Sequence, residues 1–253
     1  MMLPKITVIT ASYNSEKTIS DTIESVLNQK YPNIEYLIID GNSSDNTISI
    51  IKQYENLFEG RLKYISEKDS GIYDAWNKGV KMAQGSWISF VGSDDIMFED
   101  TFSDFIEFAK ANENVNFISS KYLLVTENLK PIRVVGVPWS NSMNSYCCIA
   151  HVGSLHHKTL FDKKGIFDSN FKIAGDYDFL LRCRDIIRPG FVDMVSANVR
   201  DGGISGRQIS RVARETVMAK KNNKSQGIFK IYTDYCIMIF KFVVRTNIIN
   251  KLK

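Results

Sequence analysis

The sequence predicts an α/β protein with a doubly wound, mostly parallel, Rossmann-like sheet and a helical C-terminal extension. Two observations lead to this fold class. Short β-branched runs alternate with amphipathic helical patterns from residue 5 to residue 118, with short connections between them. From residue 207 onward the pattern is helical. A chain of 253 residues has room for one large domain with such an appendage.

Five strands are expected in the first half of the chain, each a short apolar run that ends at polar or turn residues. They comprise residues 5–10, 34–39, 62–65, 87–91 and 116–118. The four segments between them have apolar residues on one helical face. These faces comprise Ile19, Ile23 and Val26; Ile48, Ile51 and Phe58; Tyr73, Trp76 and Val80; and Phe98, Phe102 and Phe105.

The second half is less regular. Irregular strands are expected over residues 121–137 and a further strand over residues 191–199. Helical periodicity marks residues 158–164, 176–187, 207–222 and 228–249. Gln226 and Gly227 form a hinge before the last segment. The predicted organisation is a domain of residues 1–225 and a C-terminal helix within residues 226–253.

The composition of the chain excludes few classes of function. The net charge is +4, and the basic residues gather after Lys158, which suits a phosphate-bearing ligand, an anionic membrane or a nucleic acid equally well. The 4 Cys form no C-x-x-C pair, which indicates free thiols in a reducing compartment. No signal-peptide pattern and no apolar run of about 17 residues is evident, so a cytoplasmic protein is expected.

Polar residues follow each of the first four predicted strands, and ligands of open α/β sheets bind beyond the carboxyl ends of strands. Residues 10–14 contain no glycine, so the G-x-G-x-x-G fingerprint of dinucleotide-binding sites is missing. The later strand ends are acidic and would need a cation to hold phosphates. Asp94 and Asp95 suit Mg²⁺ or Mn²⁺ for this purpose. Alternatively, one of them is the N-cap of the next helix.

Three other groups could contribute to a site. Asp176 lies where a helix begins and is either a general base or a cap. Gly202 and Gly203 precede Arg207 and a basic helix, an arrangement that can bind anions. His151 belongs to a cluster of three histidines, but no adjacent Cys or acid completes a zinc site, so a structural or substrate-facing role is expected.

Seven motifs, in order, resemble glycosyltransferase family 2 of the GT-A fold. They are T-x-x-Y-N at residues 10–14, I-I-D-G-x-S-x-D-x-T at 38–47, S-E-x-D-x-G-I-Y-D-A-x-N-K-G at 66–79, G-S-D-D at 92–95, G-x-F-D at 165–168, G-D-Y-D-x-L-x-R at 175–182 and G-G-I-S at 202–205. The pattern is most similar to bacterial members that build O-antigens, capsules and exopolysaccharides of the colanic-acid type. Two positions depart from it: Gly92 replaces the first Asp of the metal motif, and Gly175 replaces a Glu.

The resemblance implies roles for individual residues. Asp95 would be the principal ligand of Mn²⁺ or Mg²⁺, with Asp94 in support, and Asp176 would be the catalytic base. Acceptor or diphosphate contacts are expected at His151, Gly202, Gly203 and Arg207. The donor nucleotide and sugar would be bound by Thr10, Ser12, Tyr13, Asn14, Asp40, Asp69, Asn77 and Asp94. Residues 1–118 would form the nucleotide-sugar half and residues 119–225 the acceptor half.

The implied activity is an inverting transfer of a sugar from a nucleotide-sugar, UDP-linked by expectation, to a lipid-linked glycan on the cytoplasmic membrane surface; no nucleic-acid partner is expected. One alternative is a sugar nucleotidyltransferase, which would want a glycine-rich, basic first loop. The other is a non-catalytic nucleotide-sugar-binding protein, against which the retained acids argue.

The C-terminal segment is rich in apolar residues but interrupted by charges. Lys230, Asp234, Lys241 and Arg245 are spaced to share one stripe of a helix. Such a helix can lie in a membrane interface, or it can pack on the domain with one solvated edge. Peripheral association with the inner face of the membrane is expected, because acceptors of the resembling enzymes are usually lipid-linked.

Overall fold

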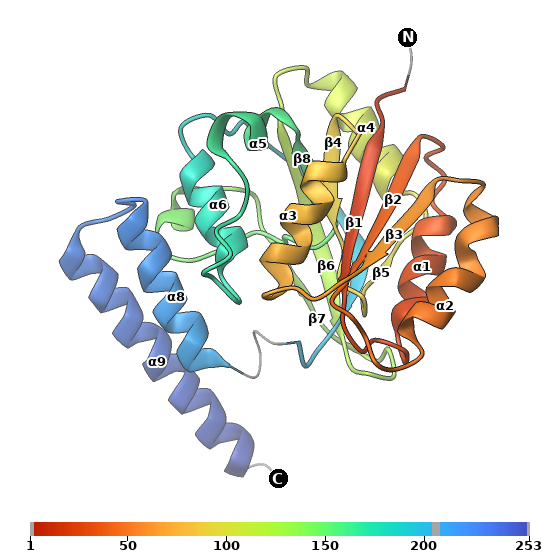
Figure 1. The fold of residues 1–253 in the computed structure, drawn as a ribbon. Helices are drawn as coiled ribbons and strands as arrows, with labels where there is room; N and C mark the ends of the chain where they lie inside the picture. Colours follow the sequence, from red (N-terminus) through yellow and green to blue (C-terminus); the bar gives the residue numbers. More distant parts are fainter. Residues whose placement is uncertain (1–2, 204–207, 252–253) are drawn as a thin grey trace.

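One sheet organises the fold (Figure 1). The computed structural model describes residues 3–203 and 208–251, and beyond Phe240 the only side chain described is that of Val244. Within these residues the sheet has nine strands in the order β3-β2-β1-β4-β8-β6-β9-β5, with β7 paired to β6. The strands are β1 Ile6–Ser12, β2 Ile34–Asp40, β3 Leu62–Ser66, β4 Trp87–Phe90, β5 Ile96–Met97, β6 Phe117–Val125, β7 Pro131–Val135, β8 Leu155–His157 and β9 Pro189–Arg200.

Helices cover both faces of the sheet because side chains of the central strands alternate between two apolar cores. In β1, Ile6 and Val8 face the core formed with α1 Ile19–Leu27, α2 Thr47–Tyr54 and α4 Thr101–Ala111. Ile9 faces the opposite core, which contains residues of α3 Ile72–Met82, α5 Thr159–Lys164 and α6 Gly175–Cys183. The predicted doubly wound α/β fold is confirmed.

The first four strands are parallel, so their carboxyl ends share one edge, the lower edge of the sheet in Figure 1. Beyond β4 the sheet is mixed: β8 is antiparallel to both β4 and β6, while β9 is parallel to β6. The sequence pattern missed β8, which has only three residues. The predicted strand at residues 116–118 is the beginning of the longer β6.

The segment after Asp95 differs from one of its two predicted alternatives. Asp95 lies in a turn before the two-residue β5, and α4 begins only at Thr101, with Asp100 at the N-cap position. The interpretation of Asp94 or Asp95 as a helix cap is therefore wrong. Residues 96–97 instead pair with β9 in the sheet.

The chain ends in a helical hairpin of α8 Ile209–Asn222 and α9 Ile228–Lys251, which lies beside α6 (Figure 1). The buried amine of Lys220 on α8 donates to Asp234 on α9 at 2.9 Å, and the Asp234 side chain is only 15% exposed. Asp234 thus faces the domain, whereas Lys230 is exposed. The predicted single solvated stripe is wrong at Asp234; the side chains of Lys241 and Arg245 lie outside the described residues.

Candidate active site

Asp40 ties together the loops that follow the first three strands. The residue is fully buried, and its carboxylate accepts hydrogen bonds from the hydroxyls of Ser12, Ser43 and Ser66 at 3.0, 2.5 and 2.7 Å. It also accepts the Ser43 N–H at 2.9 Å. These charge-assisted bonds fix the rim on which the predicted donor residues stand. Ser12 and Asp40 therefore join these loops through hydrogen bonds within the protein.

Tyr13 and Asp69 meet above Gly41. An ideal Cβ on this glycine would lie 2.8 Å from Oδ2 of Asp69 and 3.4 Å from the Tyr13 ring, so a side chain would displace the Asp69 carboxylate. The Tyr13 side chain is 65% exposed and offers an aromatic face to a planar ligand. Asn14 adopts the left-handed conformation (φ 48°), and its side-chain oxygen accepts the Ser44 N–H at 2.9 Å.

Thr10 and Asn77 do not reach this rim. Thr10 is fully buried, and its hydroxyl accepts a hydrogen bond from the Tyr36 hydroxyl at 3.1 Å. The Asn77 amide bonds to both the N–H and the carbonyl oxygen of Phe167, each at 2.9 Å. In the structure both side chains are therefore bonded within the protein, and their predicted donor contact stays a prediction.

The carboxylates of Asp94 and Asp95 converge over Gly92. An ideal Cβ at Gly92 would lie 2.6 Å from Oδ2 of Asp95 and 3.0 Å from Oδ1 of Asp94. A side chain at position 92 would displace both carboxyl groups, so this arrangement of Asp94 and Asp95 depends on glycine there. The space over Gly92 lies between two carboxyl oxygens.

Burial and mutual repulsion make the ionised forms of Asp94 and Asp95 unfavourable unless a cation lies beside them. Burial, with the charge of Asp94 added, raises the pKa of Asp95 to about 8, and burial also raises the pKa of Asp94. Within residues 3–203 and 208–251 no group of three or more His, Cys, Asp or Glu side chains is placed to hold a metal. Two carboxylates that share the ion with substrate phosphates are nevertheless the pattern that Mg²⁺ prefers, so the pair fits such an ion.

Arg200, at the end of β9, forms hydrogen bonds that hold the turn containing Asp94 and Asp95. Its guanidinium donates to the Asp94 carbonyl oxygen at 2.6 Å and to the Asp21 carboxylate at 2.5 Å. It therefore binds the main chain of the turn, while Oδ2 of Asp95 accepts the Gly92 N–H at 3.0 Å. Gly202 (φ 106°) and Gly203 follow directly, while Arg207 lies outside the described residues.

Asp176 is held through one oxygen. Its Oδ1 accepts the Tyr177 N–H at 2.8 Å and contacts the Tyr73 hydroxyl at 3.1 Å. The same hydroxyl lies 2.6 Å from the Ile173 carbonyl oxygen, so this oxygen and Oδ1 of Asp176 share its single proton. No hydrogen-bond partner of Oδ2 is found in the described part of the chain. Since Ala174 occupies the N-cap position of α6, Asp176 is not the cap.

The second departure from the motif pattern also has a steric cause. An ideal Cβ at Gly175 would lie 2.8 Å from two carbons of the Tyr73 ring. The ring thus fills the space that a Glu would need, and it delivers its hydroxyl to Asp176. Tyr73 is the principal site residue that the sequence reasoning missed.

We expect the Gly175→Ala substitution to destabilise the fold by about 1–3 kcal/mol, because the Tyr73 ring is packed and cannot easily retreat. Thermal denaturation measures the effect. Gly227→Ala is the matched control, since a Cβ there meets nothing within 4 Å. Equal melting temperatures for the two variants would contradict the steric explanation.

His151 lies in an aromatic cluster and is close enough to Asp176 to be affected by its charge. Its ring stacks on Trp76 and Phe90, with centroids 5.5 and 5.8 Å apart. Burial lowers the pKa of His151, although the charge of Asp176 opposes this shift. Both burial and this shift favour the neutral ring, and among the described residues its buried Nε2 atom has no hydrogen-bond partner.

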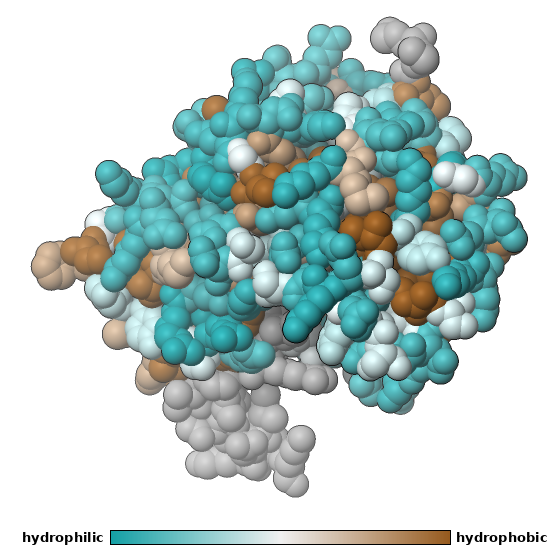
Figure 2. All heavy atoms as spheres, in the orientation of Figure 1, coloured by the Kyte–Doolittle hydropathy of each residue, from teal (hydrophilic) through white to brown (hydrophobic). Residues whose placement is uncertain are grey.

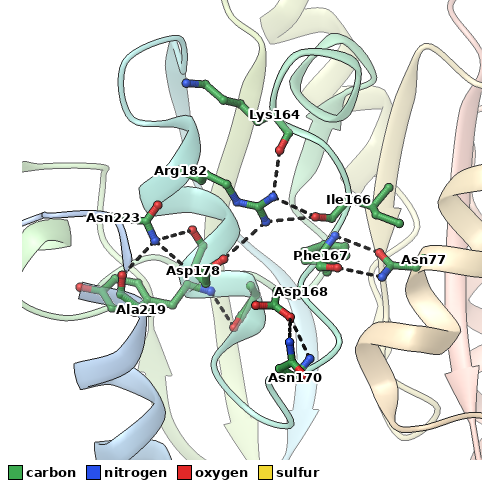
Figure 3. A network of polar contacts seen from close by, with 12 residues as sticks. Asn77, Lys164, Ile166, Phe167, Asp168, Asn170, Asp178, Arg182, Ala219 and Asn223 are labelled. Carbon is green, nitrogen blue, oxygen red and sulfur yellow. Dashed lines mark hydrogen bonds and ion pairs between the residues drawn. The ribbon is translucent and has the colours of Figure 1, made fainter. Parts of the chain in front are cut away.

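The helix that carries Asp176 is fastened to its surroundings along its length (Figure 3). Arg182 donates to the carbonyl oxygens of Lys164 and Ile166. One turn earlier in α6, the Asp178 carboxylate lies 3.4 Å from the Arg182 guanidinium and accepts a hydrogen bond from the Asn223 amide at 2.8 Å, which ties α6 to the end of α8. The G-x-F-D loop of residues 165–168 thus connects α3 with α6, because it bonds to Asn77 on α3 and to Arg182 on α6.

Comparison with known proteins gives this arrangement a family. The sequence model of glycosyl transferase family 2 matches residues 7–141 of the 253. This chain belongs to glycosyltransferase family 2. Membership favours glycosyl transfer over the nucleotidyltransferase alternative.

Named relatives of this glycosyltransferase come from bacteria. The putative teichuronic acid biosynthesis glycosyltransferase TuaG of Bacillus subtilis is 36% identical over 129 residues, which is 51% of each chain. The PGL/p-HBAD biosynthesis glycosyltransferase of Mycobacterium tuberculosis is 25% identical over 189 residues, covering 72% of this chain and 71% of the relative.

Solved structures share the fold. Staphylococcus aureus TarS 1–349 superposes with a TM-score of 0.69 at 22% identity, over 94% of this chain and 72% of that one. The mannosyltransferase PcManGT from Pyrobaculum calidifontis, solved with GDP-Man and Mn²⁺, gives 0.69 at 19% identity, over 90% and 66%. The GT-A fold predicted for this glycosyltransferase is thereby confirmed.

Proposed function

We propose that this glycosyltransferase moves a sugar from a nucleotide-sugar to a hydroxyl of a glycan acceptor during assembly of a bacterial surface polysaccharide. The carrying observation is that the predicted acids form two separate groups. One group is Asp94 and Asp95, whose carboxylates converge over Gly92. The other, Asp176, has one oxygen held and one oxygen free.

On the donor side, Tyr13 supplies a face for the base, and Asp69 lies next to it for the ribose or sugar. A UDP-sugar is the donor that we propose, since TarS has been crystallised with UDP-GlcNAc. Asp95, with Asp94, would hold Mn²⁺ or Mg²⁺, which neutralises charge on the departing diphosphate when bound. The residues of this half are 1–118.

On the acceptor side, Oδ2 of Asp176 takes the proton of the attacking hydroxyl. The oxygen then attacks the anomeric carbon from the face opposite the leaving diphosphate, so a single displacement inverts the configuration. Tyr73 keeps Oδ1 occupied, which leaves Oδ2 as the proton acceptor. We assign residues 119–225 to this acceptor half, with His151 at its floor and Gly202 and Gly203 at its edge.

Turnover with a donor panel tests the proposal. We expect release of nucleoside diphosphate from at least one UDP-, GDP- or TDP-sugar, dependent on added Mn²⁺ or Mg²⁺ and abolished by EDTA. Isothermal titration of the same donors provides a reading that needs no acceptor. If no donor is bound or consumed with either metal, the proposed function is wrong.

We further propose that the acceptor is lipid-linked and that α9 rests on the cytoplasmic face of the membrane. Apolar residues of α9 point outward: Phe229 is 89% exposed and Phe240 69%, and Figure 2 shows apolar surface at the left edge, over the helical hairpin. Lys221, Lys224 and Lys230 are exposed beside them. An apolar face flanked by lysines suits an anionic lipid surface. Among the described residues, no helix combines the length and apolarity needed to cross a bilayer.

The double variant Phe229→Glu/Phe240→Glu should bind vesicles of phosphatidylglycerol and phosphatidylethanolamine at least about tenfold more weakly, because both rings lose their apolar contact. Co-sedimentation measures the binding. Leu57→Glu/Ile132→Glu places the same charges on exposed apolar residues elsewhere and should bind normally. Equal loss in both variants, or in neither, would count against α9 as the contact.

A further inference from the structure

Three consecutive peptide N–H groups converge on the side chain of Glu215. This residue lies on α8, and its carboxylate accepts hydrogen bonds from the N–H groups of Ile173 at 2.8 Å, Ala174 at 3.0 Å and Lys172 at 3.1 Å. The three donors form the segment that leads directly into α6. Successive N–H groups that point the same way form a natural anion site, and here a side chain of the same protein fills it.

Ion pairing does not account for the position of Glu215. Among the described residues, Glu215 forms one ion pair, with Nε of Arg211 at 3.9 Å, beyond hydrogen-bond distance. The Glu215 side chain is only 12% exposed, so the carboxylate has exchanged most of its water for main-chain donors. Such bonds to an ionised acceptor are stronger than neutral ones, and they need the negative charge.

The segment held by Glu215 controls the surroundings of Asp176. Ala174 is the N-cap residue of α6, and Asp176 follows two residues later. The carbonyl oxygen of Ile173 contacts the Tyr73 hydroxyl at 2.6 Å, and that hydroxyl contacts Oδ1 of Asp176. A shift of residue 173 would therefore move the first turn of α6 and the hydroxyl that orients the base.

The rest of α6 does not depend on this contact. Asp178 and Arg182 are fastened independently to Asn223 and to the loop before the helix (Figure 3). Loss of the Glu215 charge should thus leave the helix in place but loosen its entry. This separation distinguishes a residue that positions the base from one that only stabilises the fold.

We propose that Glu215 is a positioning residue for Asp176: from α8 it holds residues 172–174 so that Oδ2 faces the acceptor hydroxyl. The inference rests on the proposed function of Asp176 as the base. It also connects the base to the helical hairpin, because α8 carries both Glu215 and Lys220, the partner of Asp234 on α9.

Glu215→Gln tests the proposal, since glutamine has the same shape without the charge. We expect kcat to fall on the order of 10–100-fold, as for other misplaced catalytic groups, with the donor KM and the donor affinity unchanged. The pKa of the basic group in the pH profile of kcat should shift, and hydrogen exchange at the N–H groups of residues 172–174 should become faster. Glu215→Asp, which keeps the charge, should restore part of the kcat.

Two control variants separate positioning from stability. Arg211→Ala removes the 3.9 Å ion pair and an exposed hydrogen bond to Gln208, but none of the bonds from residues 172–174, and should match the wild type. Asn223→Ala removes a clamp of α6 and should lower the melting temperature without shifting the pH profile. If the Glu215→Gln enzyme keeps the wild-type kcat and pH profile, the positioning role of Glu215 is wrong, while the proposed function is unaffected. A wild-type protein that binds and consumes no donor overturns the proposed function, and this inference with it.

Discussion

Replacing Asp176 with asparagine should lower kcat for sugar transfer by about 10²–10⁴-fold, the usual contribution of a general base. Asparagine keeps an oxygen that can accept from the Tyr73 hydroxyl and the Tyr177 N–H, so the local geometry should survive. Its amide nitrogen, in the place of Oδ2, cannot accept a proton. The variant should therefore bind the donor normally and fail in the chemical step.

Steady-state kinetics together with donor titration check this expectation. Asp74→Asn is a suitable control, because Asp74 is a neighbouring acid on α3 whose carboxylate accepts only the Ser70 N–H among the described contacts. A kcat of Asp176→Asn within tenfold of the wild type would assign the proton transfer to another group. A loss of donor affinity instead of kcat would place Asp176 in the donor site.

Asp95→Asn should produce opposite changes in activity and stability. Metal-dependent donor binding and turnover should be lost, because one of two converging carboxylates is neutralised. In EDTA, the variant should melt at a higher temperature than the wild type. A buried charge beside a like charge destabilises the fold, and asparagine removes that charge while retaining an acceptor for the Gly92 N–H.

The pH dependence of this gain has a definite sign. The folded-state pKa of Asp95, about 8, lies above the value of an unfolded Asp. The wild type therefore loses stability as the pH rises toward 8, and the advantage of Asp95→Asn in EDTA should grow over the same range. A gain of about 1 kcal/mol corresponds to roughly 2–4 °C. Glu107→Gln, at an exposed position, should show no such trend.

Much of the fold could be predicted because the first four strands and their helices carry their pattern locally. Strand β8 could not, since three residues show no periodicity and its place between β4 and β6 depends on antiparallel partners far away in the sequence. The alternative prediction, that Asp95 is the N-cap of the next helix, is wrong for a similar reason. Residues 96–97 pair with β9, about 100 residues later, and this delays the start of α4.

The candidate site was predictable in its acids but not in their supports. Asp40, Asp69, Asp94 and Asp95 follow strands directly, so topology alone brings them to one edge. Tyr73 was interpreted as one apolar face residue of a helix, since nothing local indicates that its hydroxyl meets residues 173 and 176. The burial of Thr10 could not be predicted either, because it depends on contact with Tyr36, on another strand.

The Lys220–Asp234 pair bears on how the C-terminal hairpin can be studied. Cutting the chain after Gly227 would remove Asp234, the counter-charge of the Lys220 amine, together with helix α9, which packs on α8. A loss of lipid binding by such a protein would therefore combine a lost membrane contact with lost packing of the hairpin. Substitutions at the exposed Phe229 and Phe240 leave the Lys220–Asp234 pair intact, so they separate the two effects.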